Sequence, residues 1–126
     1  MGNSEFVEHI VDILSRFSDI KLYRMFGGYG IYRGKIIFAI IIDDELYFKV
    51  DAKLAEEYKN AGSFPFTYKR DDKTIALSYW YVPSEIIEDR DLLKEWFNKS
   101  LKVAISQNID KQEDKKAERH KDRKIK

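Results

Sequence analysis

Residues 36–50 read IIFAIIIDDELYFKV, and this stretch decides the fold. Its first part, Ile36 to Ile42, is an apolar run rich in β-branched residues, which is typical of a strand. Asp43-Asp44 follows, and aspartate is favoured in tight turns because its side chain hydrogen-bonds the local backbone. Glu45 to Val50 then predicts the partner strand. The stretch therefore indicates a β-hairpin.

The segments on either side extend this hairpin into a sheet. Upstream, Tyr29 to Arg33 predicts a strand, and Arg33-Gly34-Lys35 forms the turn that joins it to Ile36. Three neighbouring strands with tight turns indicate an antiparallel meander. Downstream, Thr67 to Arg70 and Thr74 to Val82 predict a second hairpin around Asp71-Asp72-Lys73. The sequence thus predicts five strands.

Helices are expected before, between and after these strands. Ser4 to Phe17 repeats apolar residues at helical spacing. Ala52 to Ala61 follows the N-cap residue Asp51 and is closed by Gly62. The last helix begins near the cap residue Asp89, after a separate turn at Ser84 to Glu88, and runs to about Gln107. The predicted fold class is α+β: a two-layer, antiparallel five-stranded sheet with helices on one face, in the order α-β-β-β-α-β-β-α.

Length and charge divide the chain into a body and a tail. The 126 residues suit one domain, which we place at residues 1–107. Residues 108–126 carry eight basic and five acidic residues and almost no apolar ones, so we expect a disordered tail or at most a frayed continuation of the last helix. Residues 1–107 carry 15 basic and 17 acidic residues. This slightly acidic body argues against duplex DNA binding through phosphate contacts.

Composition also bears on the compartment. The chain contains no cysteine, which removes disulfides and thiolate chemistry and fits a reducing cytoplasm. Charged residues interrupt the first segment, so no signal peptide is indicated. The longest apolar run, Ile36 to Ile42, is far shorter than the roughly 20 residues of a membrane span. We therefore expect a cytoplasmic protein without a membrane partner.

Glycines gather at Gly27, Gly28 and Gly30. A phosphate-binding loop would end in Gly-Lys-Ser/Thr, and a dinucleotide fingerprint would follow a strand and open a helix. Here the cluster is expected to follow a helix and open a strand, so a structural bend is the better interpretation. We expect Gly28→Ala or Gly30→Ala to lower stability, because glycine tolerates positive φ where alanine does not.

No constellation of catalytic or metal-binding residues emerges. The two histidines, His9 and His120, are far apart, and no Gly-x-Ser-x-Gly stretch is present. The paired acids fall where turns or a helix start are expected. We therefore predict a protein that is not an enzyme, with no catalytic, cofactor-binding or metal-binding residues and no cofactor.

Aromatic and basic residues alternate along the predicted strands. Alternation sends about half of the strand residues to the face away from the helices, where tyrosine, tryptophan and arginine are typical of protein interfaces. The leading hypothesis is a protein-binding regulatory module that presents this face to a partner, most simply a second copy.

A single-stranded nucleic-acid binder is the alternative, favoured by exposed aromatic strands beside a basic patch. An enzyme with an unrecognised site is a third hypothesis, favoured by a deep pocket with shifted acid pKa values. The candidate surface residues are Tyr29, Tyr32, Lys49, Arg70 and Trp80.

Several segments, in order, resemble the N-terminal domain of the TfoX/Sxy competence regulators. The resemblance spans roughly Phe6 to Ile105. It is carried by Arg24-Met25-Phe26-Gly27-Gly28-Tyr29-Gly30, Phe38-Ala39, Leu46-Tyr47-Phe48-Lys49-Val50-Asp51, Ala61-Gly62 with Pro65-Phe66-Thr67-Tyr68, and Ser78-Tyr79-Trp80-Tyr81-Val82-Pro83.

This resemblance implies a two-layer α+β domain like the type III secretion chaperone folds. It also implies a role near transcriptional control of natural competence, with a transcription complex as the partner. Full-length regulators of this kind continue into a second, helical domain, where this chain has its charged tail, so we expect a stand-alone single-domain member. The family has no agreed catalytic residues, so the resemblance implies none here.

Overall fold

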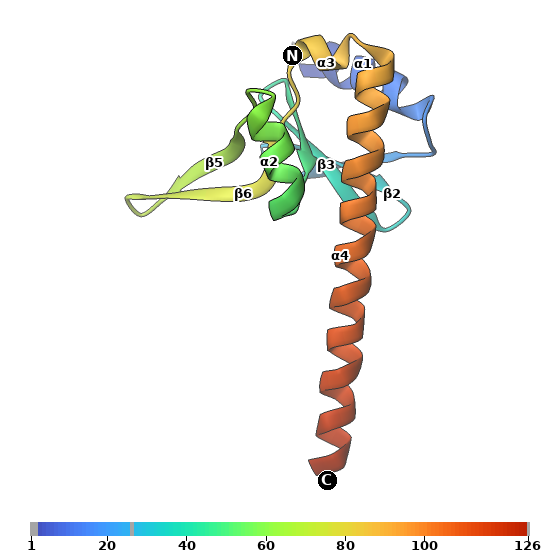
Figure 1. Ribbon diagram of the computed structural model, residues 1–126, viewed down its shortest axis with the longest axis vertical. Helices are drawn as coiled ribbons and strands as arrows, with labels where there is room; N and C mark the ends of the chain where they lie inside the picture. Colours follow the sequence, from blue (N-terminus) through green and yellow to red (C-terminus); the bar gives the residue numbers. More distant parts are fainter. Residues whose placement is uncertain (1–2, 26, 126) are drawn as a thin grey trace.

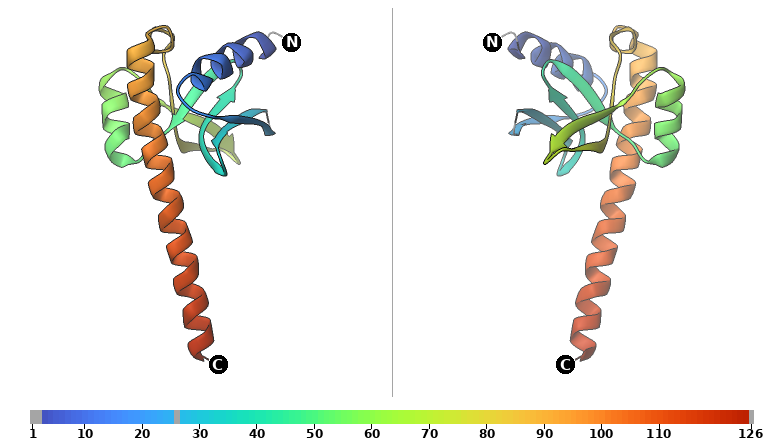
Figure 2. Two further views of the ribbon diagram at one scale, coloured as in Figure 1. Left: turned by 90° about the vertical axis from the view of Figure 1, so that its right-hand side faces the viewer. Right: turned by 90° about the vertical axis from the view of Figure 1, so that its left-hand side faces the viewer.

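In a computed structural model, helices α1, α2 and α4 lie against one face of a six-stranded antiparallel sheet (Figures 1 and 2). The structure describes residues 3–25 and 27–125, with side chains for 5–25 and 27–109. The strand order is β1-β2-β3-β4-β6-β5. The elements are α1 (Asn3–Ser15), β1 (Lys21–Met25), β2 (Gly28–Arg33), β3 (Ile36–Ile42), β4 (Glu45–Lys49), α2 (Ala52–Asn60), β5 (Pro65–Arg70), β6 (Lys73–Tyr81), α3 (Ser84–Ile87) and α4 (Arg90–Ile125).

The sheet has six strands, so the prediction of five was wrong. The additional strand is β1, which pairs antiparallel with β2 from Lys21↔Tyr32 to Met25↔Gly28. It lies at the edge of the sheet and four of its five residues are exposed, which removes the apolar pattern that would reveal a strand. The glycine cluster therefore follows a strand and not a helix, and it joins β1 to β2.

The remaining strands confirm the two predicted hairpins. β3 pairs with β4, and β5 pairs with β6, each around an Asp-Asp turn. Asp43 and Asp44 have φ of 52° and 59°, and Asp71 and Asp72 have φ of 53° and 66°. Two consecutive positive φ values belong to a type I′ turn, whose twist matches that of the flanking strands, and aspartate tolerates this conformation.

Within the glycine cluster, the structure corrects the expected reason for glycine. Gly27 has a φ of +74°, whereas Gly28 and Gly30 do not have positive φ. Gly28 is constrained by space, because a Cβ there would overlap the backbone carbonyl oxygen of Ile41. At Gly30 a Cβ would lie 2.8 Å from Met25 Sδ. Space, rather than φ, therefore favours glycine at both positions: the backbone of β3 limits it at Gly28, and side-chain ends limit it at Gly30.

One row of residues crosses all six strands and faces the helices. Its register is Leu22↔Ile31↔Ala39↔Phe48↔Trp80↔Pro65. Ile31, Ala39 and Phe48 are fully buried, and Leu22 and Trp80 pack against the same core. The pairing of β2 and β3 shifts between Ile31 and Tyr32 and leaves Phe38 as an extra residue, whose side chain also enters the core.

Aromatic contacts join the last helix to this row. Phe97 of α4 lies 5.4 Å from Phe17 and 5.2 Å from Phe38 between ring centroids. Val7, Ile10 and Leu14 of α1 complete the core on its other side. Burial of these rings, together with the aliphatic core residues, holds the two layers together.

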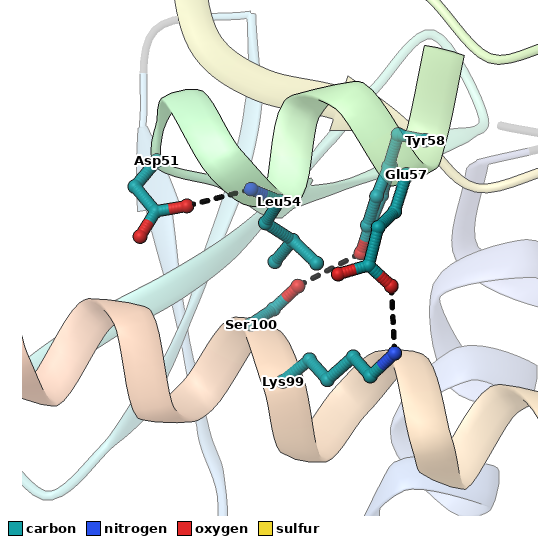
Figure 3. A network of polar contacts seen from close by, with 6 residues as sticks. All are labelled: Asp51, Leu54, Glu57, Tyr58, Lys99 and Ser100. Atoms are coloured by element: carbon teal, nitrogen blue, oxygen red, sulfur yellow. Dashed lines mark hydrogen bonds and ion pairs between the residues drawn. The ribbon is translucent and has the colours of Figure 1, made fainter. Parts of the chain in front are cut away.

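A polar network attaches α2 to α4 (Figure 3). The Asp51 carboxylate accepts a hydrogen bond from the Leu54 amide at 2.8 Å, which confirms the predicted N-cap. The Tyr58 and Ser100 hydroxyls share a buried hydrogen bond of 2.8 Å. At the surface, Lys99 Nζ donates to Glu57 Oε1 at 2.7 Å. Asp89 likewise caps α4 through the Leu92 amide, as predicted.

Helix α4 extends well beyond the body of the domain (Figure 1). The boundary predicted at residues 107/108 lies within this helix. Ala104 is buried, whereas Ile109 is 49% exposed. We predict that deleting residues 110–126 leaves the melting temperature within about 2 °C of the full chain, because the removed residues offer little apolar surface. Thermal unfolding followed by circular dichroism measures this, and a drop of several degrees would show that the tail stabilises the body.

Candidate interaction surface

The second face of the sheet carries a row of its own. Tyr23, Gly30, Ile40, Tyr47 and Tyr81 are register partners across five strands. Successive residues of a strand point to opposite faces, so this row faces away from the helices. We call this side of the sheet the open face. Its aromatic residues, among those that the structure describes, are Tyr23, Tyr32, Tyr47, Phe66, Tyr68, Tyr79 and Tyr81.

The rings of the open face cover one another. Tyr47 lies 5.3 Å from Phe66 and 6.0 Å from Tyr81 between ring centroids, and it is buried although none of the described helices covers this side. Phe64 stacks on Tyr81 at 4.8 Å with an interplanar angle of 14°. The sheet edges are more open, since Tyr23 is 52% exposed. The face thus combines a packed aromatic centre with accessible rings at its margins.

Charge is distributed unequally between the two layers. Residues 21–49 and 65–81, which form the strands and their turns, contain eight basic and five acidic residues, a net charge of +3. The remaining residues up to 107 contain seven basic and twelve acidic residues, a net charge of −5. The small negative net charge of residues 1–107 is therefore the sum of a negatively charged helical layer and a positively charged sheet.

Three of the eight basic residues of the sheet layer lie toward one end of the open face. Lys21 is the register partner of Tyr32, which is the partner of Ile37. Beside them, a cavity of about 150 Å³ lies where the sheet meets α4, lined by Lys35, Ile36, Ile37, Lys49 and Tyr79 and by Ala104, Gln107 and Asn108 of α4. Lys49 Nζ donates to Ser78 Oγ at 2.8 Å and lies 4.9 Å from the centroid of the Tyr79 ring. We call Lys21, Tyr32, Lys35, Lys49 and Tyr79 the basic corner.

The structure separates the five surface residues that the sequence suggested. Tyr32 and Lys49 belong to the open face, and Arg70 is exposed at the end of β5. Tyr29 and Trp80 pack against the core on the helix-covered face.

Sequence reasoning did not select three exposed aromatic residues of the open side, Tyr23, Phe64 and Tyr68. Tyr23 was missed together with strand β1. Phe64 lies outside the predicted strands, and only its stacking on Tyr81 brings it to this side. A sequence signal for Tyr68 was present, because it lies two positions after Phe66 and therefore on the same face of the strand. The two rings stack with 6.4 Å between their centroids.

A comparison with protein families assigns the chain. The model of the TfoX N-terminal domain matches residues 12–104, which include all six strands, α2, α3 and the first part of α4. The chain belongs to the TfoX N-terminal domain family. A comparison with curated proteins found no match. In this TfoX N-terminal domain, both faces of the sheet and all five residues of the basic corner lie within the matched residues.

Charged side chains also surround a cavity of about 210 Å³ between α1, α3 and the start of α4. Within it, His9 Nε2 lies 3.8 Å from Glu88 Oε1, and Arg16 contacts Asp12 at 2.9 Å. All four side chains are largely exposed. Among residues 5–25 and 27–109 of this TfoX N-terminal domain, no group of three histidine, aspartate or glutamate side chains is placed to hold a metal ion. None of the helices in the described part of the chain has the length and apolar character needed to cross a membrane.

Three tyrosines of the domain have perturbed ionisation. Burial, with a hydrogen bond to the Glu45 carboxylate at 3.0 Å, raises the pKa of Tyr47 well above its usual range. Burial also raises the pKa of Tyr58. At the basic corner, burial and the neighbouring Tyr32 raise the pKa of Tyr79 to about 12. Each phenol is therefore held neutral by the fold.

These shifts predict a loss of stability in alkali. Because the folded-state pKa of these tyrosines exceeds the ordinary 10.0, their contribution is complete below pH 10 and is lost as the pH rises through the folded value, about 12 for Tyr79. We expect a nearly constant melting temperature from about pH 7 to 9 and a fall between about pH 10 and 12.

Tyr79→Phe removes one of these ionisations. We expect the fall in melting temperature between about pH 10 and 12 to be smaller in this variant than in the unmodified domain, measured by thermal unfolding across that range. An identical pH dependence in the two proteins would contradict the effect of Tyr79. The comparison at pH 7 separates ionisation from any loss of packing.

Proposed function

We propose that this TfoX N-terminal domain is a non-enzymatic regulatory module that acts by binding a macromolecular partner on its open face. The observation that carries the proposal is that the described helices cover one face of the sheet only, while the other face bears seven aromatic side chains. Exposed aromatic surface of this kind is typical of interaction sites. The family relationship supports a regulatory or binding role.

A protein of a transcription-control complex is the partner that the family relationship favours. A second copy of the chain is the simplest protein partner, because two-fold dimers are the commonest assemblies. A cytoplasmic location is part of the same proposal. Single-stranded nucleic acid is the other class of partner, and the net charge of +3 on the sheet favours it specifically.

The proposal is tested by changing exposed open-face residues without touching the core. The double variant Tyr23→Ser/Tyr68→Ser alters two exposed rings at opposite edges of the sheet, and we expect it to lose the partner. Leu92→Ser is the matched control, because Leu92 is exposed to a similar extent but lies on α4. Partners captured by the purified domain are compared by mass spectrometry, and self-association is measured by sedimentation over a concentration series.

Both variants should melt like the unmodified domain, since all three positions are exposed. The proposal is defeated if the Tyr23→Ser/Tyr68→Ser variant retains every captured partner while Leu92→Ser loses one. That result would place the binding surface on the helical layer.

A further inference from the structure

We propose that the basic corner and the adjoining aromatic edge of the open face bind single-stranded nucleic acid. This inference rests on the proposed function, because it names the partner of the same surface. It starts from two open-face lysines that each have a tyrosine as register partner. Lys21 is the register partner of Tyr32, and Lys49 is the register partner of Tyr79. A cation beside an accessible ring can hold one phosphate while the ring stacks on one base. Tyr79 is largely buried, so Lys49 supplies charge here. The exposed ring beside Lys21 and Tyr32 is Tyr23.

Accessible rings supply the stacking surface. Tyr23 is 52% exposed and contacts Tyr32 edge-on, with 5.2 Å between ring centroids. Both rings belong to adjacent strands, so they form a continuous aromatic edge beside Lys21. Every base has a π-face, and stacking on such rings requires a strand whose bases are not already paired. This requirement favours a single strand over a duplex.

Lysines supply the complementary charge. Lys35 and Lys49 line one cavity together with Tyr79 and with Ala104, Gln107 and Asn108 of α4. On the described strand positions of the open face, Glu45 is the one carboxylate, and it accepts a hydrogen bond from Tyr47 at 3.0 Å. The acidic residues are concentrated in the helical layer on the opposite side. Within residues 1–107, a polyanion would therefore approach the sheet and not the acidic helical layer.

The same charges disfavour a second copy as the occupant. In a two-fold dimer each residue near the axis meets its own counterpart. Lys21, Lys35 and Lys49 would then lie near the equivalent lysines of the second copy, with Glu45 alone to offset them among the described open-face strand positions. Like charges brought together in this way oppose association.

The test uses the full chain and fluorescein-labelled oligonucleotides of about twelve residues, read by fluorescence anisotropy. Oligothymidine and oligouridine are the single-stranded DNA and RNA probes, and a duplex of the same length is the third. We expect both single strands to bind at least about tenfold more tightly than the duplex. The slope of log K against log salt should be about −2, since three lysines contribute about −0.7 each on a single strand.

Matched variants locate the binding. Lys21→Glu/Lys35→Glu should weaken single-strand binding by about tenfold or more, and Tyr23→Ala by at least about fivefold, the loss of one stacked base. Lys53→Glu/Lys94→Glu makes the same change of charge at exposed positions of the helical layer and should change the affinity by less than about twofold. A difference between the oligothymidine and oligouridine constants tells which nucleic acid is preferred.

Three results would overturn the inference. The first is that neither single strand binds at low salt, and the second is that the duplex binds as tightly as the single strands. The third is that the Lys21→Glu/Lys35→Glu and Tyr23→Ala variants bind single strands as tightly as the unmodified chain, which would place the binding site in another part of the chain. If oligonucleotides fail to bind while Tyr23→Ser/Tyr68→Ser still loses a protein partner or a dimer, this inference fails and the proposed function stands. If oligonucleotides fail to bind and Tyr23→Ser/Tyr68→Ser also keeps every protein partner and its oligomeric state, both this inference and the proposed function fail.

Discussion

Gly28→Ala should destabilise this TfoX N-terminal domain by about 3 kcal/mol, the upper range for inserting atoms into a filled site. The added Cβ would overlap the carbonyl oxygen of Ile41, and it would lie 3.1 Å from the Ile41 carbonyl carbon. Both atoms belong to the backbone of β3, so no side-chain rotation relieves the contact. Only separation of β2 from β3 would make room, and this separation breaks the ladder between them. Urea unfolding monitored by tryptophan fluorescence measures the change.

The neighbouring glycines provide the controls. Gly27→Ala meets nothing within 4 Å, so its cost comes from a φ of +74° alone and should be about 1 kcal/mol. Gly30→Ala should fall between the two, because Met25 Sδ, 2.8 Å from the new Cβ, ends a flexible side chain. If Gly28→Ala unfolds at the same urea concentration as the unmodified domain but loses its partner, the glycine serves binding and the structural explanation is wrong.

Phe97→Ala should cost about 3–5 kcal/mol and leave at most a marginally folded domain. Phe97 is 1% exposed, and its ring joins α4 to Phe17 and to Phe38 of β3. Truncation to alanine would leave a cavity between the helical layer and the sheet, which the backbone of two packed layers cannot close. The free energy of unfolding from urea titration checks the value.

Leu92→Ala on the same helix is the matched control. Leu92 is 41% exposed, so its truncation should change the free energy of unfolding by less than about 0.5 kcal/mol. A small effect at Phe97, equal to that at Leu92, would mean that α4 does not form the core contact described here.

Local features of the sequence were sufficient for most elements. The run Ile36 to Ile42 and the pairs Asp43-Asp44 and Asp71-Asp72 predicted both hairpins correctly, because β-branched residues and turn-forming aspartates act within a few positions. Capping residues are also local signals, and they predicted where helices begin. Asp51 and Asp89 predicted the starts of α2 and α4, since a cap is a contact between residues three positions apart.

Strand β1 and the candidate site could not be predicted in this way. Four of the five residues of β1 are exposed, and the strand exists because β2 offers it hydrogen bonds. The basic corner likewise joins residues from β1, β2, β4, β6 and the turn after β2, which the strand order brings together. The net charge of residues 1–107 did not indicate the basic corner, because the negative charge of the helical layer exceeds the positive charge of the sheet.

The sequence by itself determined that aromatic residues alternate along the strands and must therefore occupy two faces of a sheet. Only the tertiary structure decided which face the helices cover. Trp80 and Tyr79 are neighbours with equal strand preference, yet Trp80 packs against the core and Tyr79 lies beside Lys49. The two residues differ because of register: a shift of one residue exchanges the two faces, and the register of β6 is fixed by its pairing with β4 and β5.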